Sequence, residues 1–256
     1  MNTFDWILKI GSQYYAQFLS GTLNTIIMAV VGTGVGFLIG LLIAVVRSIP
    51  VDEETPLVKK IPLKILDVIL EAHVQIIRGT PMLVQALIIH YSFFQRIGMP
   101  SLLSALIIIS VNTGAYMAEI VRGGILSIDK GQFEGAHAIG MTHTQTMVNV
   151  VLPQAIRNIM PSIGNEFVVN IKDSSVLSVI SITELMFAAK QAGGAYMQFV
   201  PSYLICAVIY FILTFTVSKL LRLVEKKLNG SENYTVCGSQ SDSAAEIHVN
   251  REERQA

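Results

Sequence analysis

Long apolar stretches separated by short polar intervals dominate this chain. No Lys, Arg, Asp or Glu occurs between Lys9 and Arg47. A bilayer core takes about 20 apolar residues per helix, so this stretch predicts a membrane-spanning helix at about residues 23–46. Within it Gly32, Gly36 and Gly40 recur at every fourth position, which places them on one face where another helix can approach closely.

Four further stretches are long and apolar enough to be candidate spans, at residues 65–95, 101–118, 160–185 and 200–217. The stretch 65–95 carries Asp67, Glu71 and Arg78 in its first half, and the stretch 160–185 is interrupted by Lys172 and Asp173. The composition agrees with a membrane protein, since 52% of the residues are hydrophobic and only 14% are charged. We therefore expect an all-α integral membrane protein with about five transmembrane helices.

Basic residues predict the orientation of these spans. They cluster after the first, third and fifth stretch, whereas the opposite side has few: Arg47, Lys59, Lys60, Lys64, Arg122, Lys130, Arg157, Lys219, Arg222, Lys226 and Lys227 against Lys9, Arg96 and Lys190. The positive-inside rule then places the N-terminus outside and the C-terminus in the cytoplasm. We expect an extracytoplasmic segment at 1–18, a transmembrane domain at 19–228 and a disordered, polar cytoplasmic tail at 229–256.

The interval at about 122–160 is the longest one predicted on the cytoplasmic side. Residues 132–150 of this interval predict two short helices that meet near Gly140, where glycine permits a turn that a side chain would hinder. Thr142 and Gln145 have the spacing of a capping box, which starts a helix. An ordinary amphipathic helix lying in the membrane interface is the alternative interpretation of this spacing.

Specific residues of this interval resemble the docking loop of membrane subunits of ATP-binding-cassette (ABC) importers: Glu134, Gly135, Ala136, Gly140, Leu152 and Pro153. Three more blocks resemble the branch that takes up polar amino acids, and they occur in the family's order: residues 78–85, 112–125 and 165–175. The resemblance covers about residues 11–228. Gly135 departs from the family pattern, which usually has Ala, at a cost to the helix of about 1 kcal/mol.

This resemblance implies a type I ABC importer fold with a cytoplasmic coupling helix in the bacterial cytoplasmic membrane. It implies a non-catalytic permease subunit, with the six docking-loop residues as the contact to the ATPase. The implied partners are two ATPase subunits, which bind ATP and Mg, a second permease subunit (identical or homologous), an extracytoplasmic solute-binding protein, membrane lipid and a polar amino acid as cargo. Transport would follow alternating access, with the ATPases biasing the two states.

Two groups of residues are candidates for the substrate path. Glu166 and Asp173 lie seven positions apart, nearly two helical turns, so both carboxylates share one face. Ionisable groups in a span are costly and usually face a polar cavity or a partner, and an internal ion pair with Lys172 or Arg78 is the equal alternative. Arg78 and Thr80 precede Pro81, which must loosen the helix; the kink is either a gate or simple packing. Glu119 and Arg122 are placed to form a structural pair.

Other classes of function find less support in the sequence. No Gly-x-x-x-x-Gly-Lys-Ser/Thr loop occurs, so nucleotide must be bound by another chain, and the histidines have no zinc-like spacing. No nucleophile–base pair indicates an enzyme, and we expect no nucleic-acid partner. A secondary transporter coupled to an ion gradient through Glu166, Asp173 or Lys172 remains an alternative. A membrane scaffold that binds an ATPase without transporting is another.

Overall fold

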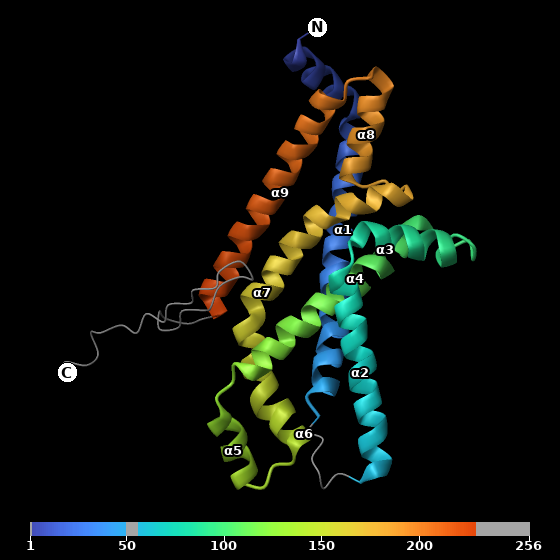
Figure 1. Cartoon of the computed structure of the whole chain (residues 1–256). Coiled ribbons are helices and arrows are strands. Elements are labelled where there is room, and N and C mark those ends of the chain that lie inside the picture. Colours follow the sequence, from blue (N-terminus) through green and yellow to red (C-terminus); the bar gives the residue numbers. More distant parts are fainter. Residues whose placement is uncertain (1, 50–55, 229–256) are drawn as a thin grey trace, which may run out of the picture.

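The structure, a computed structural model, describes residues 2–49 and 56–228, and the predicted tail at 229–256 lies outside them. Every regular element in the described residues is helical, which agrees with the all-α prediction (Figure 1). The elements are α1 (Thr3–Arg47), α2 (Leu57–Gly79), α3 (Met82–Ile89), η1 (His90–Phe94), α4 (Ser101–Leu126), α5 (Lys130–Ala138), α6 (His143–Thr146), η2 (Met147–Val151), α7 (Leu152–Asp173), η3 (Ser174–Ile180), α8 (Leu185–Tyr196) and α9 (Phe199–Leu228).

Helix α1 is much longer than predicted. It has 45 residues, about 68 Å at ~1.5 Å per residue, so the expected start near residue 23 is wrong, and no break separates residues 3–18 from the span. The Asp5 carboxylate accepts a hydrogen bond from the Asn2 N–H at 3.0 Å, which stabilises the first turn. Ile10 and Phe18 are buried in one cluster with Leu185 of α8. Tertiary packing therefore extends the helix beyond its most apolar stretch.

The glycine face of α1 packs against α4, as the four-residue repeat predicts. A Cβ atom at Gly36 would lie 2.8 Å from the Thr113 Cβ, and one at Gly40 would lie 2.5 Å from the Met117 Cβ. Successive glycines of α1 face successive turns of α4, so the two helices run parallel. Only residues without a side chain allow the backbones to approach this closely.

The predicted span at 65–95 is not one straight helix. Helices α2 and α3 are separated at Thr80–Pro81 and bent by 109° (Figure 1). Proline lacks the N–H that would continue the helix, so the predicted loosening at Arg78–Pro81 is confirmed. The freed carbonyls are satisfied by the Gln85 side chain, whose Nε2 donates to Ile77 O at 2.8 Å and to Thr80 O at 3.0 Å.

The predicted span at 160–185 is likewise wrong as a single helix. Helix α7 ends at Asp173, η3 follows, and Ser181 has a positive φ of 61°. A new helix, α8, then begins because the Glu184 carboxylate accepts hydrogen bonds from the N–H groups of Met186 and Phe187 at 2.7 and 2.6 Å. The chain between the two helices therefore changes direction instead of crossing straight through.

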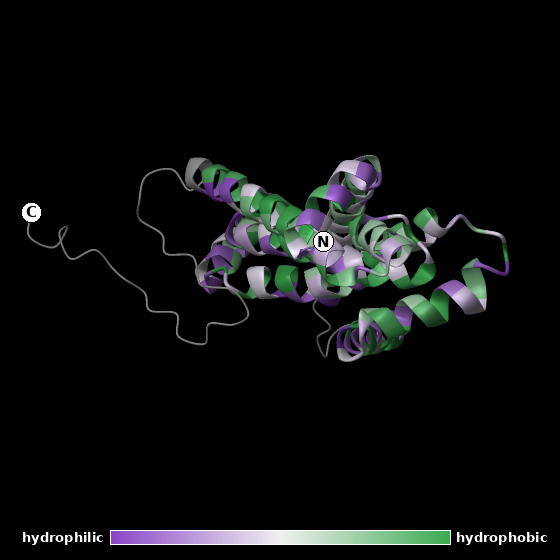
Figure 2. Ribbon diagram, turned by 90° about the horizontal axis from the view of Figure 1, so that it is seen from above, coloured by the Kyte–Doolittle hydropathy of each residue, from purple (hydrophilic) through white to green (hydrophobic). Residues whose placement is uncertain are grey.

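Three helices of the described residues are long and apolar enough to cross a membrane: α1, α4 and α9. The bent pair of α2 with α3 and η1 makes a fourth if it counts as one span, so the prediction of five spans stays a prediction. Apolar side chains are exposed on these helices, among them Phe211, Ile212 and Phe215 of α9. Figure 2 shows hydrophobic residues along much of the helical ribbon. A surface of this kind suits the hydrocarbon core of a bilayer.

Candidate coupling segment and polar membrane face

Helix α5 carries three of the predicted docking-loop residues. It begins at an Asp129 cap, whose Oδ1 accepts from the Gly131 N–H at 2.7 Å. Ala136 and Phe133 face the protein: Ala136 is buried, and Phe133 packs against the cluster that joins α1, α4, η2 and α7. Glu134 and Gly135 are exposed, and no atom lies within 4 Å of a Cβ built at Gly135. One face of α5 is thus fixed and the other is open.

Gly140 ends α5 with a Schellman motif. Its φ is +82°, a left-handed conformation that glycine adopts without a Cβ penalty. The Gly140 N–H donates to His137 O at 2.9 Å, and the Met141 N–H donates to Ala136 O at 3.1 Å. These two bonds satisfy carbonyls at the end of the helix and fix the angle of the turn, which confirms the predicted turn at Gly140.

Helix α6 starts at the predicted capping box. The Thr142 Oγ1 accepts from the Gln145 N–H at 3.3 Å, and the Gln145 Oε1 accepts from the Thr142 N–H at 2.9 Å. The helix continues through the π-helical turn η2 into α7, whose second residue is Pro153. A wider π turn accommodates the missing N–H and the ring of Pro153 without a break. Leu152 and Pro153 therefore mark a continuous junction between α6 and α7.

The two parts of the docking-loop motif come together in space. Helix α5 contacts η2, and the Gln154 Nε2 donates to the Gln132 Oε1 at 3.3 Å. Leu152 is half-buried in the same cluster as Phe133, whereas Pro153 is exposed. We call residues 129–153 the coupling segment. It lies at the end of the molecule opposite the N-terminus, where α1 ends and α2 begins (Figure 1).

His143 is a partly buried histidine of the coupling segment. Partial burial lowers the pKa of His143 below its usual value, the nearby His137 lowers it further, and a hydrogen bond with the Ser48 backbone partly opposes both effects. The neutral form of His143 is therefore favoured in the folded segment.

Glu166 and Asp173 both lie on α7, as predicted, with Asn170 between them on the same side of the helix. Glu166 is 8% exposed, and neither carboxylate forms an ion pair with any side chain in residues 2–49 or 56–225. Asn170 is buried and fixed: its Nδ2 donates to the Thr33 Oγ1 at 2.8 Å, and its Oδ1 accepts from the Thr113 Oγ1 at 2.9 Å. The acidic face of α7 is therefore held in place by an amide rather than by opposite charge.

Arg78 and Thr80 take up separate contacts at the break between α2 and α3. The Arg78 NH1 lies 3.8 Å from the Glu119 Oε2, and its guanidinium lies over the Tyr116 ring at 5.5 Å. The Thr80 Oγ1 donates to Ile76 O at 2.8 Å and accepts from the Gln85 Nε2 at 2.8 Å. Arg78 and Thr80 thus lie together at the break, whereas Glu166 and Asp173 lie on α7.

Sequence reasoning missed the amide side chains that organise this region. Gln85, besides bridging the break, accepts from the Asn112 Nδ2 at 3.0 Å, and Asn170 joins three helices. An available signal was the presence of Asn and Gln inside otherwise apolar stretches, where each buried amide must find hydrogen-bond partners. The predicted pair of Glu119 and Arg122 is confirmed at 2.8 Å.

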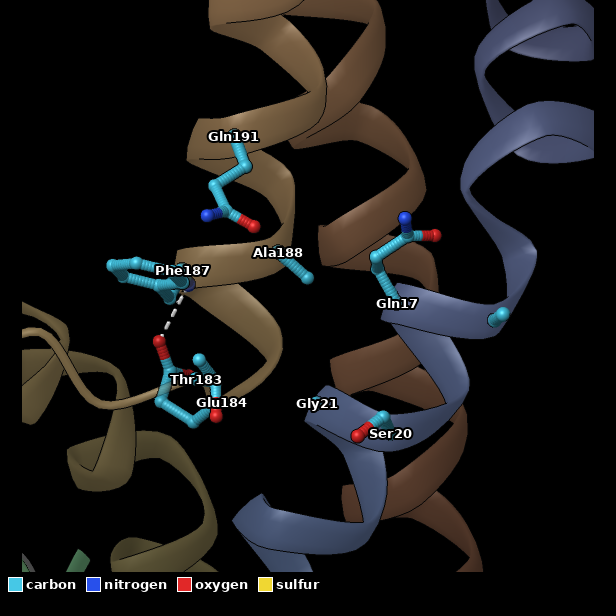
Figure 3. A pocket seen from close by; sticks show the side chains of 9 residues that line it. Gln17, Ser20, Gly21, Thr183, Glu184, Phe187, Ala188 and Gln191 are labelled. Atoms are coloured by element: carbon cyan, nitrogen blue, oxygen red, sulfur yellow. Dashed lines mark hydrogen bonds between the residues drawn. The ribbon is translucent and has the colours of Figure 1, made fainter.

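A groove of about 410 Å³ lies between α1 and α8, towards the N-terminal end (Figure 3). Gln17, Ser20, Thr183, Glu184 and Gln191 supply its polar lining. The Glu184 side chain is fully buried, and its oxygens already accept from Met186, Phe187 and the Tyr210 hydroxyl at 2.9 Å. Glu184 therefore fixes α8 and leaves little capacity for a ligand. The described part of the chain contains no cluster of His, Cys, Asp and Glu that could hold a metal ion.

Comparisons with known proteins give consistent matches. Residues 60–230 match the family model described as binding-protein-dependent transport system inner membrane component. The L-cystine transport system permease protein of Bacillus subtilis (strain 168) is 37% identical over 199 residues, 77% of this chain and 82% of that protein. The nopaline transport system permease protein of Agrobacterium fabrum (strain C58) is 37% identical over 221 residues, 82% of this chain and 90% of that one.

Solved structures of ABC transporters resemble this chain as well. A crystal structure of an amino acid ABC transporter with histidines superposes with a TM-score of 0.73 at 36% identity, covering 84% of this chain and 96% of that chain. A methionine ABC transporter shares the fold with a TM-score of 0.62 at 20% identity, covering 82% and 97%.

Proposed function

Since the chain belongs to the family of binding-protein-dependent transport system inner membrane components, we propose that it is the membrane-spanning permease subunit of an ATP-driven importer for a polar amino acid. The relatives named above are permease proteins of an L-cystine and of a nopaline transport system. The type I importer fold agrees with this assignment. The cargo class rests on the relatives, and the mechanism rests on the geometry described next.

The observation that carries the mechanism is the rigid connection between the coupling segment and the acidic face of α7. An exposed helix, α5, is fixed through the Gly140 turn to α6, and α6 continues through η2 into the helix that bears Glu166. A displacement imposed on α5 is therefore transmitted along one continuous helical element. We propose that a separate ATPase subunit contacts the exposed residues around Glu134 to Gly140 and supplies this displacement.

The proposed substrate path runs along α7 and past the break between α2 and α3. Glu166 and Asp173 offer acceptors for the ammonium group of an amino acid, and neither is used in an ion pair with another described residue. Arg78 and Thr80 border the break, where a change in helix angle would open or close the path. A carboxylate inside a membrane-spanning region costs free energy unless it faces a polar cavity or a partner.

The proposed assembly follows from the chemistry that this chain lacks. Two ATPase subunits would bind ATP and Mg on the cytoplasmic side, a second permease subunit would complete the membrane domain, and a solute-binding protein would deliver substrate outside. The subunit would lie in the bacterial cytoplasmic membrane with its N-terminus outside. ATP binding would shift the population between two access states, and hydrolysis would reset it.

Reconstitution into proteoliposomes with the partner ATPase and solute-binding protein tests this function. We expect uptake of a radiolabelled polar amino acid that requires ATP on the ATPase side and that stops when the ATPase is omitted. Uptake driven by a proton or sodium gradient without ATP would overturn the proposal in favour of an ion-coupled transporter. ATPase binding without any uptake would instead indicate a scaffold.

A further inference from the structure

Six charged side chains of α1, α2 and α4 form one connected set of ion pairs. The Arg47 guanidinium lies 2.9 Å from the Asp67 carboxylate, 3.4 Å from that of Glu71 and 3.5 Å from that of Glu119. Glu119 in turn lies 3.8 Å from Arg78 and 2.8 Å from Arg122. The Arg47 and Glu119 side chains are only 14% and 19% exposed, so the two residues that connect the set are largely withdrawn from water.

Helix α2 has few other attachments to the rest of the protein. Val74 is its only buried residue, and it packs in a small cluster with Ile43 of α1 and Ala118 of α4. Helices α1 and α4, by contrast, are joined closely along the whole glycine face. The ion pairs are therefore a large part of what fixes α2 to the α1–α4 pair.

The end of α2 is built to bend. Thr80 is extended, with φ −125° and ψ 145°, and Gly79 has open space where a side chain would lie. Beyond the break, α3 is attached to α4 through the hydrogen bond between Gln85 and Asn112. The Gln85 Nε2 also donates to Ile77 O of α2 at 2.8 Å, so a rotation about residues 79–81 that moves α2 while α3 keeps its place on α4 must break this hydrogen bond.

The geometry of Arg78 indicates that the ion pairs can be redistributed. Its pair with Glu119 is the longest of the set, and its buried Nε has no hydrogen-bond partner in the described part of the chain. A buried donor without a partner calls for an explanation. Because three arginines share one carboxylate, loss of the contact to Arg78 leaves Glu119 paired with the other two. Release of α2 also separates Asp67 and Glu71 from Arg47, but their side chains are 48% and 53% exposed and that of Arg78 is 31% exposed, so water can solvate the charges that α2 carries away.

We propose that Arg47, Asp67, Glu71, Arg78 and Glu119 form a charge latch that holds α2 against α1 and α4 in one access state and releases it during transport. The latch rests on the proposed transport function, which it deepens by naming the helix that moves. Arg47 and Glu119 act as positioning residues, since they hold helices and need not touch substrate.

A reversible cross-link tests the latch. Arg47→Cys and Asp67→Cys, in a background with Cys206 and Cys237 replaced, would be bridged by a reducible bis-thiol reagent. We expect uptake to fall on the order of tenfold when bridged and to recover after reduction. The matched control bridges Gln13→Cys and Tyr196→Cys, which replace a hydrogen-bonded pair of α1 and α8 at the other end of the molecule; this bridge should leave uptake unchanged. Full uptake with the 47–67 bridge in place would overturn the latch.

A distance measurement keeps the latch testable even if the cysteine variants transport poorly. Spin labels at Lys64 of α2 and Leu126 of α4, both exposed, report the separation of the helices. We expect a narrow distance distribution without nucleotide, and a broader or longer one in Glu119→Gln. Identical narrow distributions in both proteins would refute the latch. Absence of ATP-dependent uptake by the unmodified protein would instead refute the proposed function, whatever the distances show.

Discussion

Asn170 of α7 donates a hydrogen bond of 2.8 Å to Thr33 of α1, which lies 137 positions earlier in the chain. The same amide accepts from Thr113 of α4, so one buried side chain joins three helices. Removing one partner of a buried hydrogen bond costs about 1–3 kcal/mol. Asn170 lies about one helical turn from Glu166. We infer that these hydrogen bonds hold the backbone of α7 in place, so that a substitution of Glu166 changes its charge without moving the helix.

Neutralising Glu166 should alter transport without unfolding the protein. Glu166→Gln keeps the shape and removes the charge, and no described ion-pair partner is left stranded. We expect slower uptake or a changed substrate preference, with assembly and basal ATP hydrolysis retained, measured in proteoliposomes. Asn170→Ala is the contrast, and should lower thermal stability by about 1–3 kcal/mol. Parental uptake of every amino acid by Glu166→Gln would remove Glu166 from the path.

The contact between α1 and α4 should not tolerate a side chain. Gly40→Val would place a branched side chain where a Cβ alone lies 2.5 Å from Met117, and overpacking of this kind typically costs about 1–3 kcal/mol. Gly34→Val is the matched control on the same helix, because nothing lies within 4 Å of its Cβ. Thermal unfolding in detergent should separate the two variants, and equal melting temperatures would contradict the packing argument.

A substitution at Gly140 should disrupt the coupling segment, whereas a substitution at Gly135 should not. Gly140→Val forces a branched residue to a φ of +82°, which costs about 1–2 kcal/mol or more for an L-residue. We expect lost uptake and weaker co-purification of the ATPase, with the protein still in the membrane. Gly135→Ala should instead stabilise α5 by up to about 1 kcal/mol. If Gly140→Val keeps both ATPase binding and stimulated hydrolysis, the segment does not couple the two subunits.

The coupling segment should also weaken in acid. The pKa of His143 is lowered in the folded segment, below the value of about 6.5 expected when unfolded, so the unfolded segment binds more protons. The stability that His143 contributes to the segment is therefore fully present above about pH 6.5 and is lost as the pH falls through its folded pKa. Less ATPase should co-purify at low pH, and His143→Gln should flatten that dependence. An NMR titration should show the pKa of His143 rising in His137→Gln.

The membrane orientation can be tested at the same segment. With the N-terminus outside and five spans, residues 122–157 and the tail lie in the cytoplasm. A single cysteine introduced as His137→Cys, which is exposed on α5, should react with an impermeant thiol reagent only after the cells are opened. Labelling in intact cells would place the segment outside and refute the orientation.

Local features of this protein could be predicted from its sequence. The turn at Gly140, the cap at Thr142 and the pair of Glu119 with Arg122 each depend on residues a few positions apart. The glycine face of α1 was predictable for the same reason, since its repeat is written within one helix. The break at Pro81 was also predictable, because proline removes a backbone donor wherever it occurs.

Features that depend on distant partners could not be predicted. The first fifteen or so residues of α1 contain polar side chains such as Ser12, Gln13 and Gln17, and they are helical because Ile10 packs on α8 and α9. The 109° angle after α2 depends on Gln85 meeting Asn112 of another helix. The network around Arg47 combines three helices, of which only the pair within α4 is local. A span predicted from hydropathy alone contains none of this information.

The π turn at Met147–Val151 has a geometric consequence for how the two ends of this element are aligned. It inserts one residue into an otherwise α-helical repeat, and one residue corresponds to roughly 100° of rotation about the axis. The side chains of α6 are therefore rotated about the helix axis by this amount, compared with the positions they would have if α6 ran into α7 as a continuous α-helix. Deleting a single residue here would leave both helices intact in sequence, yet it would rotate the side chains that we propose contact the ATPase relative to Glu166 and Asn170.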